Sequence, residues 1–354
     1  MKIKLFACGG ENAVSEYQLG LGYLKSNCVG DIEIVKDESQ LNDCDMIGLS
    51  SGAGGLKEAV DILHSTDIPV IIGGQGTMWK GLDDYAFKHI IHGEGEIAFQ
   101  RIIDGDNLPK NIKEPNIENL DSLKYPDRGK CTNMIPILTS RGCPYNCHFC
   151  SSQKYWGKPR WHSVEYFIDE VEYVLKTQPQ AEILYIMDDL FIVNEKRFRD
   201  IYEVWMAKGL HEYLEPQGFI RSKGLTLDKA KMMKQMGFRQ VRFGAETASD
   251  RLLKHINKQE TVEDHQKCVD ICNEIGLNVC CSLMQYLPSE TPEDRRATAK
   301  FRMKNKNGLH IAGNYRFQPF PGTHFYSGGN PLEYDWRCRG GSVNRNFKAE
   351  GVLK

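Results

Sequence analysis

The chain has no long hydrophobic run and no excess of charge of either sign. A membrane-spanning helix needs about 18 or more consecutive apolar residues, and no such stretch occurs in the 354 residues. The opening residues 1–6 also lack the apolar core of an export signal. Lysine and arginine total 45 and aspartate and glutamate 47, a net charge of −2, so no basic field favours nucleic acid. We therefore expect a cytoplasmic protein without nucleic-acid or membrane partners.

Two common nucleotide-binding signatures are also missing. No Gly-x-Gly-x-x-Gly follows the first predicted strand and no Gly-Lys-Ser loop occurs, so neither a dinucleotide site nor a phosphate loop is indicated. The composition, 41% hydrophobic and 26% charged, is that of a globular chain. Its length predicts about two domains.

Cysteine is present in unusual number, with 12 in the chain. Cytoplasmic thiols stay reduced, so metal binding, catalysis or burial are better explanations than disulfides. Cys268 and Cys272 lie four residues apart on a predicted helix, which favours core packing over a second metal site. Seven others are interpreted as structural: Cys8, Cys28, Cys44, Cys131, Cys280, Cys281 and Cys338.

The remaining three, Cys143, Cys147 and Cys150, lie close together on a segment broken by glycine and proline. Such a loop can curl around one centre. Three soft ligands without an obvious fourth suit an iron–sulfur cluster with one open iron better than a closed zinc site. His148 could complete a zinc site, but it lies between two of the cysteines.

The pattern Cys-x-x-x-Cys-x-x-Cys, with Phe149 before the last cysteine, resembles the signature of the radical S-adenosylmethionine (SAM) enzymes. The resemblance implies that the cysteines hold a 4Fe–4S cluster whose fourth iron binds SAM. An electron then cleaves SAM to a 5′-deoxyadenosyl radical that abstracts hydrogen. It also implies an electron donor such as flavodoxin or ferredoxin.

Strand-like and helix-like runs alternate after the cysteine loop, which predicts an α/β fold. With the resemblance, we expect a partial (β/α)6 barrel of the TIM type over residues 131–325. Predicted strands are 135–139, 183–187, 217–221, 241–246, 279–284 and 312–317, and predicted helices are 163–175, 227–236 and 261–275.

Polar residues at the carboxyl ends of barrel strands are the better functional candidates. The resemblance places SAM near Phe149, Asp188, Asp189, Arg221, Glu246, Thr247 and Gln285. The aspartates would accept from ribose hydroxyls and the amino group, and Arg221 would pair with the methionyl carboxylate. The alternatives are helix caps for Asp189 and Thr247 and a surface ion pair for Arg221. Residues 283–294 resemble an element that approaches adenine, with Gln285 and Ser289 in place of its usual small residues.

Residues 1–105 carry a separate alternating pattern that predicts a small doubly wound, Rossmann-like sheet, followed by a polar linker, 106–130. Together they resemble the cobalamin-binding domain fused before the barrel in one large group of radical SAM enzymes. The resemblance places cobalamin at glycine-rich strand ends: Ser50, Ser51, Gly73, Gly74, Gly93, Glu94 and Gly95. The cobalt-ligating Asp-x-His-x-x-Gly motif is missing, since residues 9–14 read Gly-Gly-Glu-Asn-Ala-Val. A sheet that no longer binds the corrinoid is the alternative.

The resemblance implies a methyltransferase that acts on an unactivated carbon, or on phosphorus, of a small-molecule or peptide substrate. The main alternative is radical chemistry without methyl transfer: ring contraction, epimerisation, cyclisation or oxidation. Cys280, Cys281 or Cys338 could then donate a hydrogen atom. A methylthiotransferase is disfavoured because Cys8, Cys28 and Cys44 do not fall at strand ends. A corrinoid-binding or regulatory module is disfavoured because all three cluster cysteines are present. Residues 326–354 are expected to cap the barrel or to form a loop-rich terminus.

Overall fold

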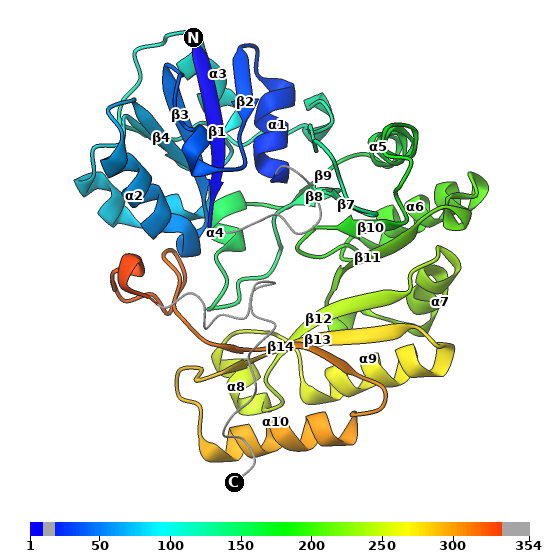
Figure 1. The fold of residues 1–354 in the computed structure, drawn as a ribbon. Helices are drawn as coiled ribbons and strands as arrows, with labels where there is room; N and C mark the ends of the chain where they lie inside the picture. The colour runs from blue at the N-terminus through cyan, green and yellow to red at the C-terminus, as the bar shows by residue number, and fades with distance from the viewer. Residues whose placement is uncertain (10–17, 335–354) are drawn as a thin grey trace. The chain divides into compact units, whose positions relative to one another are not determined.

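The computed structural model describes residues 1–9 and 18–334. These residues form two compact units (Figure 1). The N-terminal unit contains residues 1–132, 150–162 and 319–334, and the barrel unit contains residues 133–149 and 163–318. The chain therefore passes from one unit to the other within the cysteine loop, at Cys150.

The N-terminal unit is built on a six-stranded parallel sheet with the order β2-β1-β3-β4-β5-β6. Its strands are β1 (Lys2–Cys8), β2 (Asp31–Ile34), β3 (Met46–Ser51), β4 (Val70–Gly73), β5 (His89–Ile91) and β6 (Asn111–Ile112). Its helices include α1 (Leu19–Asn27), α2 (Leu56–Ser65) and α3 (Glu96–Ile103). The strand order reverses at β1, so the predicted doubly wound sheet is confirmed.

Two hydrophobic cores lie on opposite faces of this sheet. Ile47, Leu49 and Ile72 pack with α2 on one face, whereas Ile3 and Leu5 pack with α1 and α3 on the other. The alternation follows from the pleat, which directs successive side chains to opposite faces. Both faces are covered, which is why the central strands β3 and β4 are largely apolar.

The polar segment expected to be a linker joins the N-terminal unit. Its residues Asn111–Ile112 form β6, which pairs with the edge strand β5. Further along, Asp127 N donates to Gly22 O of α1 (3.2 Å), and Lys25 Nζ lies 2.8 Å from Asp127 Oδ2. A Cβ on Gly22 would lie 2.1 Å from Asp127 O, so only glycine permits this approach.

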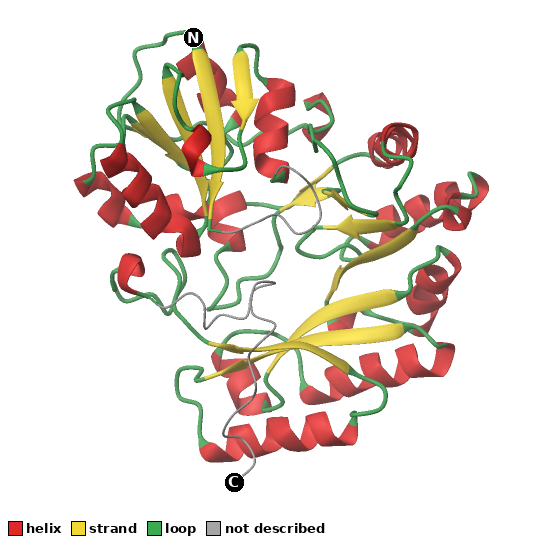
Figure 2. Ribbon diagram, in the orientation of Figure 1, coloured by secondary structure: helices red, strands yellow, loops and turns green. Residues whose placement is uncertain are grey.

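The barrel unit contains a second parallel sheet, whose order β14-β13-β12-β11-β10-β7 follows the chain without reversal. Its strands are β7 (Met134–Ile137), β10 (Ile183–Ile186), β11 (Glu215–Ile220), β12 (Gln240–Glu246), β13 (Asn278–Gln285) and β14 (His310–Arg316). The helices α5 (Val164–Thr177), α6 (Glu195–Ala207), α7 (Leu227–Gln235), α8 (Asp250–His255), α9 (Val262–Ile275) and α10 (Pro292–Lys304) lie between them in the chain (Figure 2). All six predicted barrel strands are thus confirmed.

Local signals set the helix ends. Ser163, Thr226 and Thr261 accept hydrogen bonds from the first turns of α5, α7 and α9, as N-caps do. Gly276 ends α9 in the left-handed conformation, at φ 66°. Three shorter elements flank the cysteine loop: β8 (Ser140–Arg141) before it, and α4 (Ser152–Trp156) and β9 (Arg160–Trp161) after it.

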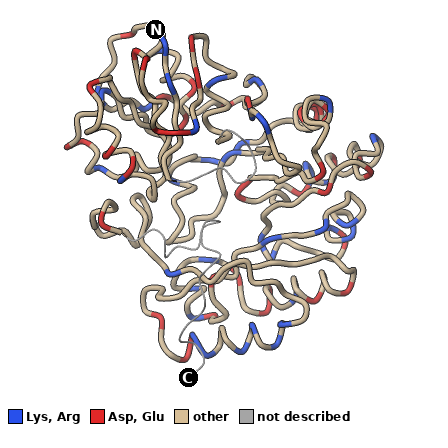
Figure 3. Tube along the Cα trace, in the orientation of Figure 1, with Lys and Arg blue, Asp and Glu red and all other residues tan. Residues whose placement is uncertain are grey.

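Charges of both signs are spread over both units (Figure 3). Within residues 1–9 and 18–334, no helix is both long enough and apolar enough to cross a membrane. Every cysteine in the described part of the chain is a free thiol.

Candidate functional site

The cysteine loop follows β8 in the barrel unit. Cys143 is partly buried, Cys147 is buried, and Cys150, the first residue of the segment 150–162, is exposed. A 4Fe–4S cluster that keeps one iron open needs three thiolate ligands, and the role of these three cysteines as its ligands stays a prediction. Among the described residues, no three histidine, cysteine or acidic side chains are gathered so as to hold a single metal ion.

The end of helix α8 holds the cysteine loop from one side. His148 N donates to Ile256 O (2.9 Å), and His148 Nδ1 donates to His255 O (2.9 Å). Asn257 Nδ2 donates to Asn146 O (2.8 Å). The Nδ1 of His148 is therefore engaged by the end of α8.

A buried charge network lies behind the loop. Lys258 Nζ is 3.2 Å from Glu246 Oε1 and 3.7 Å from Glu260 Oε2, and Arg221 Nη2 is 3.4 Å from Glu260 Oε2. All four residues are less than a tenth exposed. Burial lowers the pKa of Lys258, but Glu246 and Glu260 raise it, and the net pKa is above its ordinary value.

These cations also contact the cysteine loop. Arg221 stacks on Tyr145, 3.7 Å from the ring centroid, and Lys258 Nζ lies 5.9 Å from the centroid of Phe149. Burial raises the pKa of Cys147, while the charges of Lys258 and Arg221 lower it in part. Positive charge favours the thiolate, which is the form that binds iron, so the surroundings of Cys147 fit a cluster ligand.

Arg221 was expected to pair with the methionyl carboxylate of SAM, but its guanidinium already has partners within the protein. Besides Glu260, the guanidinium donates to Lys258 O. Glu260 is held further by Ser222 Oγ (2.7 Å) and Lys223 N (3.0 Å). The positive charge of Arg221 is thus balanced by a protein carboxylate, and the alternative of a surface ion pair does not apply because both groups are buried.

Adjacent Asp188 and Asp189, which follow β10, have different environments. Asp188 is 1% exposed, and its carboxylate accepts four hydrogen bonds from Thr139 and Ser140. The carboxylate of Asp188 therefore has no acceptor position left for the predicted contact with the ribose or the amino group of SAM. Asp189 is exposed. Burial raises the pKa of Cys143 to about 11, and the charge of Asp189 contributes to the rise, so Asp189 faces the cysteine loop.

The other predicted SAM contacts lie at the ends of β12 and β13. Glu246, the last residue of β12, has φ 60°, a left-handed conformation that is costly for a non-glycine residue. Thr247 is buried and its hydroxyl lies 3.2 Å from Thr298 Oγ1 of α10. Gln285 is half-buried and lines a small cavity of about 20 Å³ together with Glu290.

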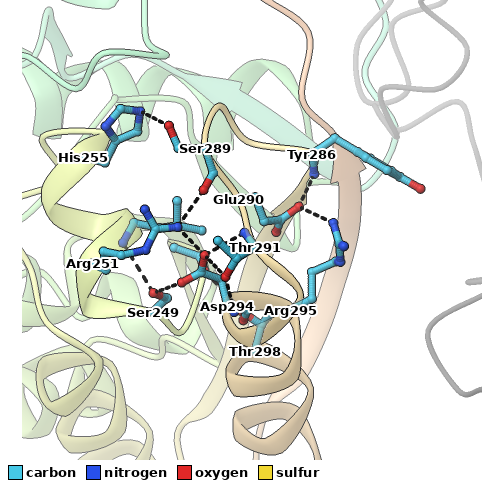
Figure 4. A network of polar contacts seen from close by, with 12 residues as sticks. Ser249, Arg251, His255, Tyr286, Ser289, Glu290, Thr291, Asp294, Arg295 and Thr298 are labelled. Atoms are coloured by element: carbon cyan, nitrogen blue, oxygen red, sulfur yellow. Dashed lines mark hydrogen bonds and ion pairs between the residues drawn. The ribbon is translucent and has the colours of Figure 1, made fainter.

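A polar network fixes the loop after β13, the one expected to approach adenine (Figure 4). Asp294 accepts from Ser249 Oγ (2.5 Å), from Thr291 N and Oγ1 (2.8 and 2.9 Å) and from Arg251. Arg251 also donates to Ser289 O (2.6 Å). These hydrogen bonds hold the pKa of Asp294 well below its usual range, although burial acts the other way.

The cysteines named as weak candidates for hydrogen-atom transfer have little solvent access. Cys280 and Cys281 of β13 are 2% and 1% exposed, and burial raises the pKa of both thiols. Cys268 and Cys272 are fully buried, consistent with core packing. Cys338 lies outside the described residues, as do residues 10–17 of the loop after β1.

In the N-terminal unit, glycines lie at the carboxyl ends of the three neighbouring strands β3, β4 and β5, where no side chain covers their backbone. We call these positions the bare strand ends. Among residues 1–9 and 18–334, a Cβ on Gly52 would meet no atom within 4 Å, and one on Gly73 would meet only Ile91 Cβ at 4.0 Å. A Cβ on Gly93, at φ 85°, would meet its nearest atom at 3.9 Å. The open backbone after β3, β4 and β5 fits a large flat ligand such as a corrin, which needs close approach to the main chain. A cofactor role for Ser50 and Gly95 stays a prediction.

Three other residues predicted to bind cobalamin have intramolecular roles. Ser51 is 1% exposed and donates its hydroxyl proton to Gly52 O. A Cβ on Gly74 would lie 2.6 Å from Ser51 O, so this glycine allows two loops to pack together. Glu94, 6% exposed, accepts from Arg160 Nη2 (2.5 Å) and from Ile117 N (2.8 Å). Its carboxylate therefore connects Arg160, which follows the cysteine loop, to Ile117 in the segment that was predicted to be a linker.

Sequence reasoning missed Lys258, Glu260 and Asn257. The available signal was the run Asn-Lys-Gln-Glu at residues 257–260, in which Lys258 and Glu260 are two residues apart. Asn257 and Gln259 both have positive φ, 52° and 57°, which directs the intervening Lys258 inward. That backbone conformation cannot be read from residue types alone.

Three comparisons bear on this arrangement. Residues 137–302 match the model of the Radical SAM superfamily. An uncharacterised methyltransferase of Pyrococcus horikoshii is 31% identical over 325 residues, 80% of this chain and 69% of that protein. The anaerobic magnesium-protoporphyrin IX monomethyl ester cyclase of Cereibacter sphaeroides is 24% identical over 73% of this chain, which spans only 44% of that protein.

Solved structures show the same fold. The radical SAM methyltransferase TsrM from Kitasatospora setae matches 92% of this chain and 75% of its own, with a TM-score of 0.74 and 17% identity. The cysteine loop follows the first strand of a parallel sheet whose strand order follows the chain. This is the arrangement of a radical SAM enzyme. The chain belongs to the radical SAM superfamily. Its N-terminal doubly wound sheet and its barrel have the fold of the cobalamin-dependent members.

Proposed function

We propose that the chain is a cobalamin-dependent methyltransferase that methylates an unactivated carbon, or phosphorus, of a small-molecule or peptide substrate. The observation that carries the proposal is that a radical SAM cysteine loop and a doubly wound sheet with bare glycine strand ends occur in one chain. The 31% identical relative is named a methyltransferase. TsrM has been solved with cobalamin and a 4Fe–4S cluster bound, which supports the same cofactor pair here.

The cofactors supply the reactive chemistry: the cluster delivers one electron to SAM, and cobalamin carries the methyl group. The protein must bind and orient them. Cys143, Cys147 and Cys150 would hold the cluster. Asp189 and Glu246 would be the acidic side chains that receive the amino group and ribose of SAM, since carboxylates accept hydrogen bonds from ammonium and hydroxyl groups. Glu246 would do so while also paired with Lys258. A low-potential electron donor such as flavodoxin or ferredoxin is part of this proposal.

The test is anaerobic reconstitution with iron, sulfide and hydroxocobalamin, followed by gel filtration and incubation with SAM and dithionite. The proposal predicts a corrinoid absorption spectrum that co-elutes with the protein, and formation of S-adenosylhomocysteine. If 5′-deoxyadenosine forms but neither the corrinoid nor S-adenosylhomocysteine is found, the enzyme performs radical chemistry without methyl transfer. The cyclase relative illustrates that alternative.

A substitution at the bare strand ends makes the cobalamin test specific. Gly73→Phe places a ring where the backbone is open, and we expect it to lower the corrinoid that co-elutes by about tenfold, because the ring fills the contact surface. Gly20→Phe is the matched control, since Gly20 is exposed on α1 and a Cβ there meets nothing within 4 Å. Equal corrinoid retention by both variants would place the cofactor elsewhere.

A further inference from the structure

The point where the chain leaves β7 for the cysteine loop depends on one side chain. β7 pairs with β10 as far as Ile137 opposite Ile186. Beyond that pair, the backbone N–H groups of Thr139 and Ser140 donate to Asp188 Oδ1, at 2.6 and 3.0 Å. A buried N–H group must find an acceptor. Asp188 therefore supplies acceptors that a neighbouring strand would otherwise provide.

The second carboxylate oxygen of Asp188 is used in the same way. Thr139 Oγ1 and Ser140 Oγ donate to Asp188 Oδ2, at 2.5 and 2.7 Å. A carboxylate offers about four acceptor positions, and Thr139 and Ser140 fill all four. With 1% of its surface exposed, Asp188 has no acceptor left for SAM or substrate.

Arg197 of α6 holds this arrangement from behind. Its Nη1 donates to Thr139 Oγ1 (3.1 Å) and its Nη2 to Thr139 O (3.2 Å). Because the hydroxyl of Thr139 accepts from Arg197, its own proton is directed to Asp188. The two residues at the base of the cysteine loop are thus fixed through both backbone and side chain.

The fixed residues are close to the first cysteine in the chain. Cys143 is three residues after Ser140, and between them Gly142 turns the chain at φ 94°. Asp189, the neighbour of Asp188, is exposed and on the cysteine-loop side.

We propose that Asp188 is a positioning residue that fixes Thr139 and Ser140, and through them the cysteine loop that holds the cluster. The proposal rests on cluster binding by the superfamily signature and is independent of methyl transfer. It is tested without cobalamin or substrate, so a failure of the methyltransferase proposal leaves it intact.

The experiment compares Asp188→Ala and Asp188→Asn with the wild type after anaerobic reconstitution. Iron and sulfide per chain, the electron paramagnetic resonance signal of the reduced cluster, and the rate of iron removal by a chelator are measured. We expect Asp188→Ala to lose iron about tenfold faster, the low end for loss of a group that orients metal ligands. Asp188→Asn should recover most of the retention, because its carbonyl can still accept from both N–H groups.

Val171→Ala is the control for stability, since Val171 is fully buried on α5 of the same unit and its truncation leaves a cavity that destabilises the fold. It should keep the cluster at the wild-type rate even if the protein unfolds at lower urea concentration. Equal loss of iron from both alanine variants would mean that Asp188 acts only through global stability. A full, stable cluster in Asp188→Ala that no longer changes its resonance signal on addition of SAM would make Asp188 a cofactor ligand. Either result would overturn the proposal.

Discussion

At the scale of single residues, the network around Lys258 shows how buried charges can hold a reactive loop. Glu246 and Glu260 are both buried, and the ammonium group of Lys258 lies between them. Burying two carboxylates without a cation is costly, because their desolvation is then uncompensated. The network therefore keeps these carboxylates paired in the interior of the barrel unit, and the charges of Lys258 and Arg221 act on Cys147.

Lys258→Met tests this role. Removal of one partner of a buried ion pair typically costs about 3–5 kcal/mol, and we expect the free energy of unfolding to fall by that order in urea titrations followed by circular dichroism. The double variant Lys258→Met/Glu260→Gln should recover part of the loss. Lys254→Met is the control, because Lys254 is exposed on α8. A loss no greater than that of the control would contradict the account.

His265 of α9 gives a prediction about pH. It is fully buried near the rings of Phe243 and Phe301, neither ring nitrogen has a hydrogen-bond partner in the described structure, and burial lowers its pKa to about 4. The unfolded chain, with a histidine pKa near 6.5, binds a proton that the folded chain does not. Stability must therefore fall as the pH drops from about 6.5 towards 4.

At pH 5.5 this single group should cost about 1 kcal/mol relative to neutral pH. His265→Leu should remove that part of the acid sensitivity, which urea titrations at pH 7.5 and 5.5 would measure. His310→Leu is a suitable control, because His310 is exposed at the start of β14. The same loss in wild type and His265→Leu would mean that His265 is not the group that titrates.

At the scale of elements, residue 127 of the predicted linker segment lies close to Gly22 of α1. Substitution of Gly22 and of Gly20, on the same helix, tests this contact. Gly22→Ala should destabilise the N-terminal unit by about 1–3 kcal/mol, because the added Cβ would overlap Asp127 O and force the backbones apart. Gly20→Ala should be neutral or stabilising by up to about 1 kcal/mol, since its Cβ meets nothing. Thermal unfolding of the two variants provides the comparison, and equal melting temperatures would contradict the docking of residue 127 on α1.

Elements whose signals are local were predictable from the sequence. The N-caps Ser163 and Thr261 and the C-terminal Gly276 act on their own helices, and the apolar strand runs are continuous because both faces are covered. The site was predictable only as far as its motif. Asp188 binds Thr139, 49 residues away, and Glu94 binds Arg160, 66 residues away. Residue type shows that such groups are polar but not whether they face a cofactor or the protein.

The same limit applies to β6. Residues 111–112 are too short to show a strand period and lie in a polar segment, so only pairing with β5 makes them a strand. Likewise, the inward direction of Lys258 depends on the positive φ of its neighbours Asn257 and Gln259. Tertiary context decides both features.

At the scale of the whole molecule, the two units serve two cofactors in this account. The singly wound sheet carries the cysteine loop, and the doubly wound sheet carries the bare strand ends proposed for the corrin. The fold match to TsrM covers 92% of the chain, so both units belong to it. The central claim is that the cluster held by the three loop cysteines cleaves SAM reductively.

The most direct test is to measure 5′-deoxyadenosine by liquid chromatography after anaerobic reconstitution and reduction by dithionite. The account predicts that the wild type and Cys44→Ala, whose partly buried cysteine precedes β3 in the N-terminal unit, form 5′-deoxyadenosine, whereas Cys147→Ala forms none. Absence of 5′-deoxyadenosine from wild-type protein with a full complement of iron and sulfide, or equal formation by Cys147→Ala, would contradict it.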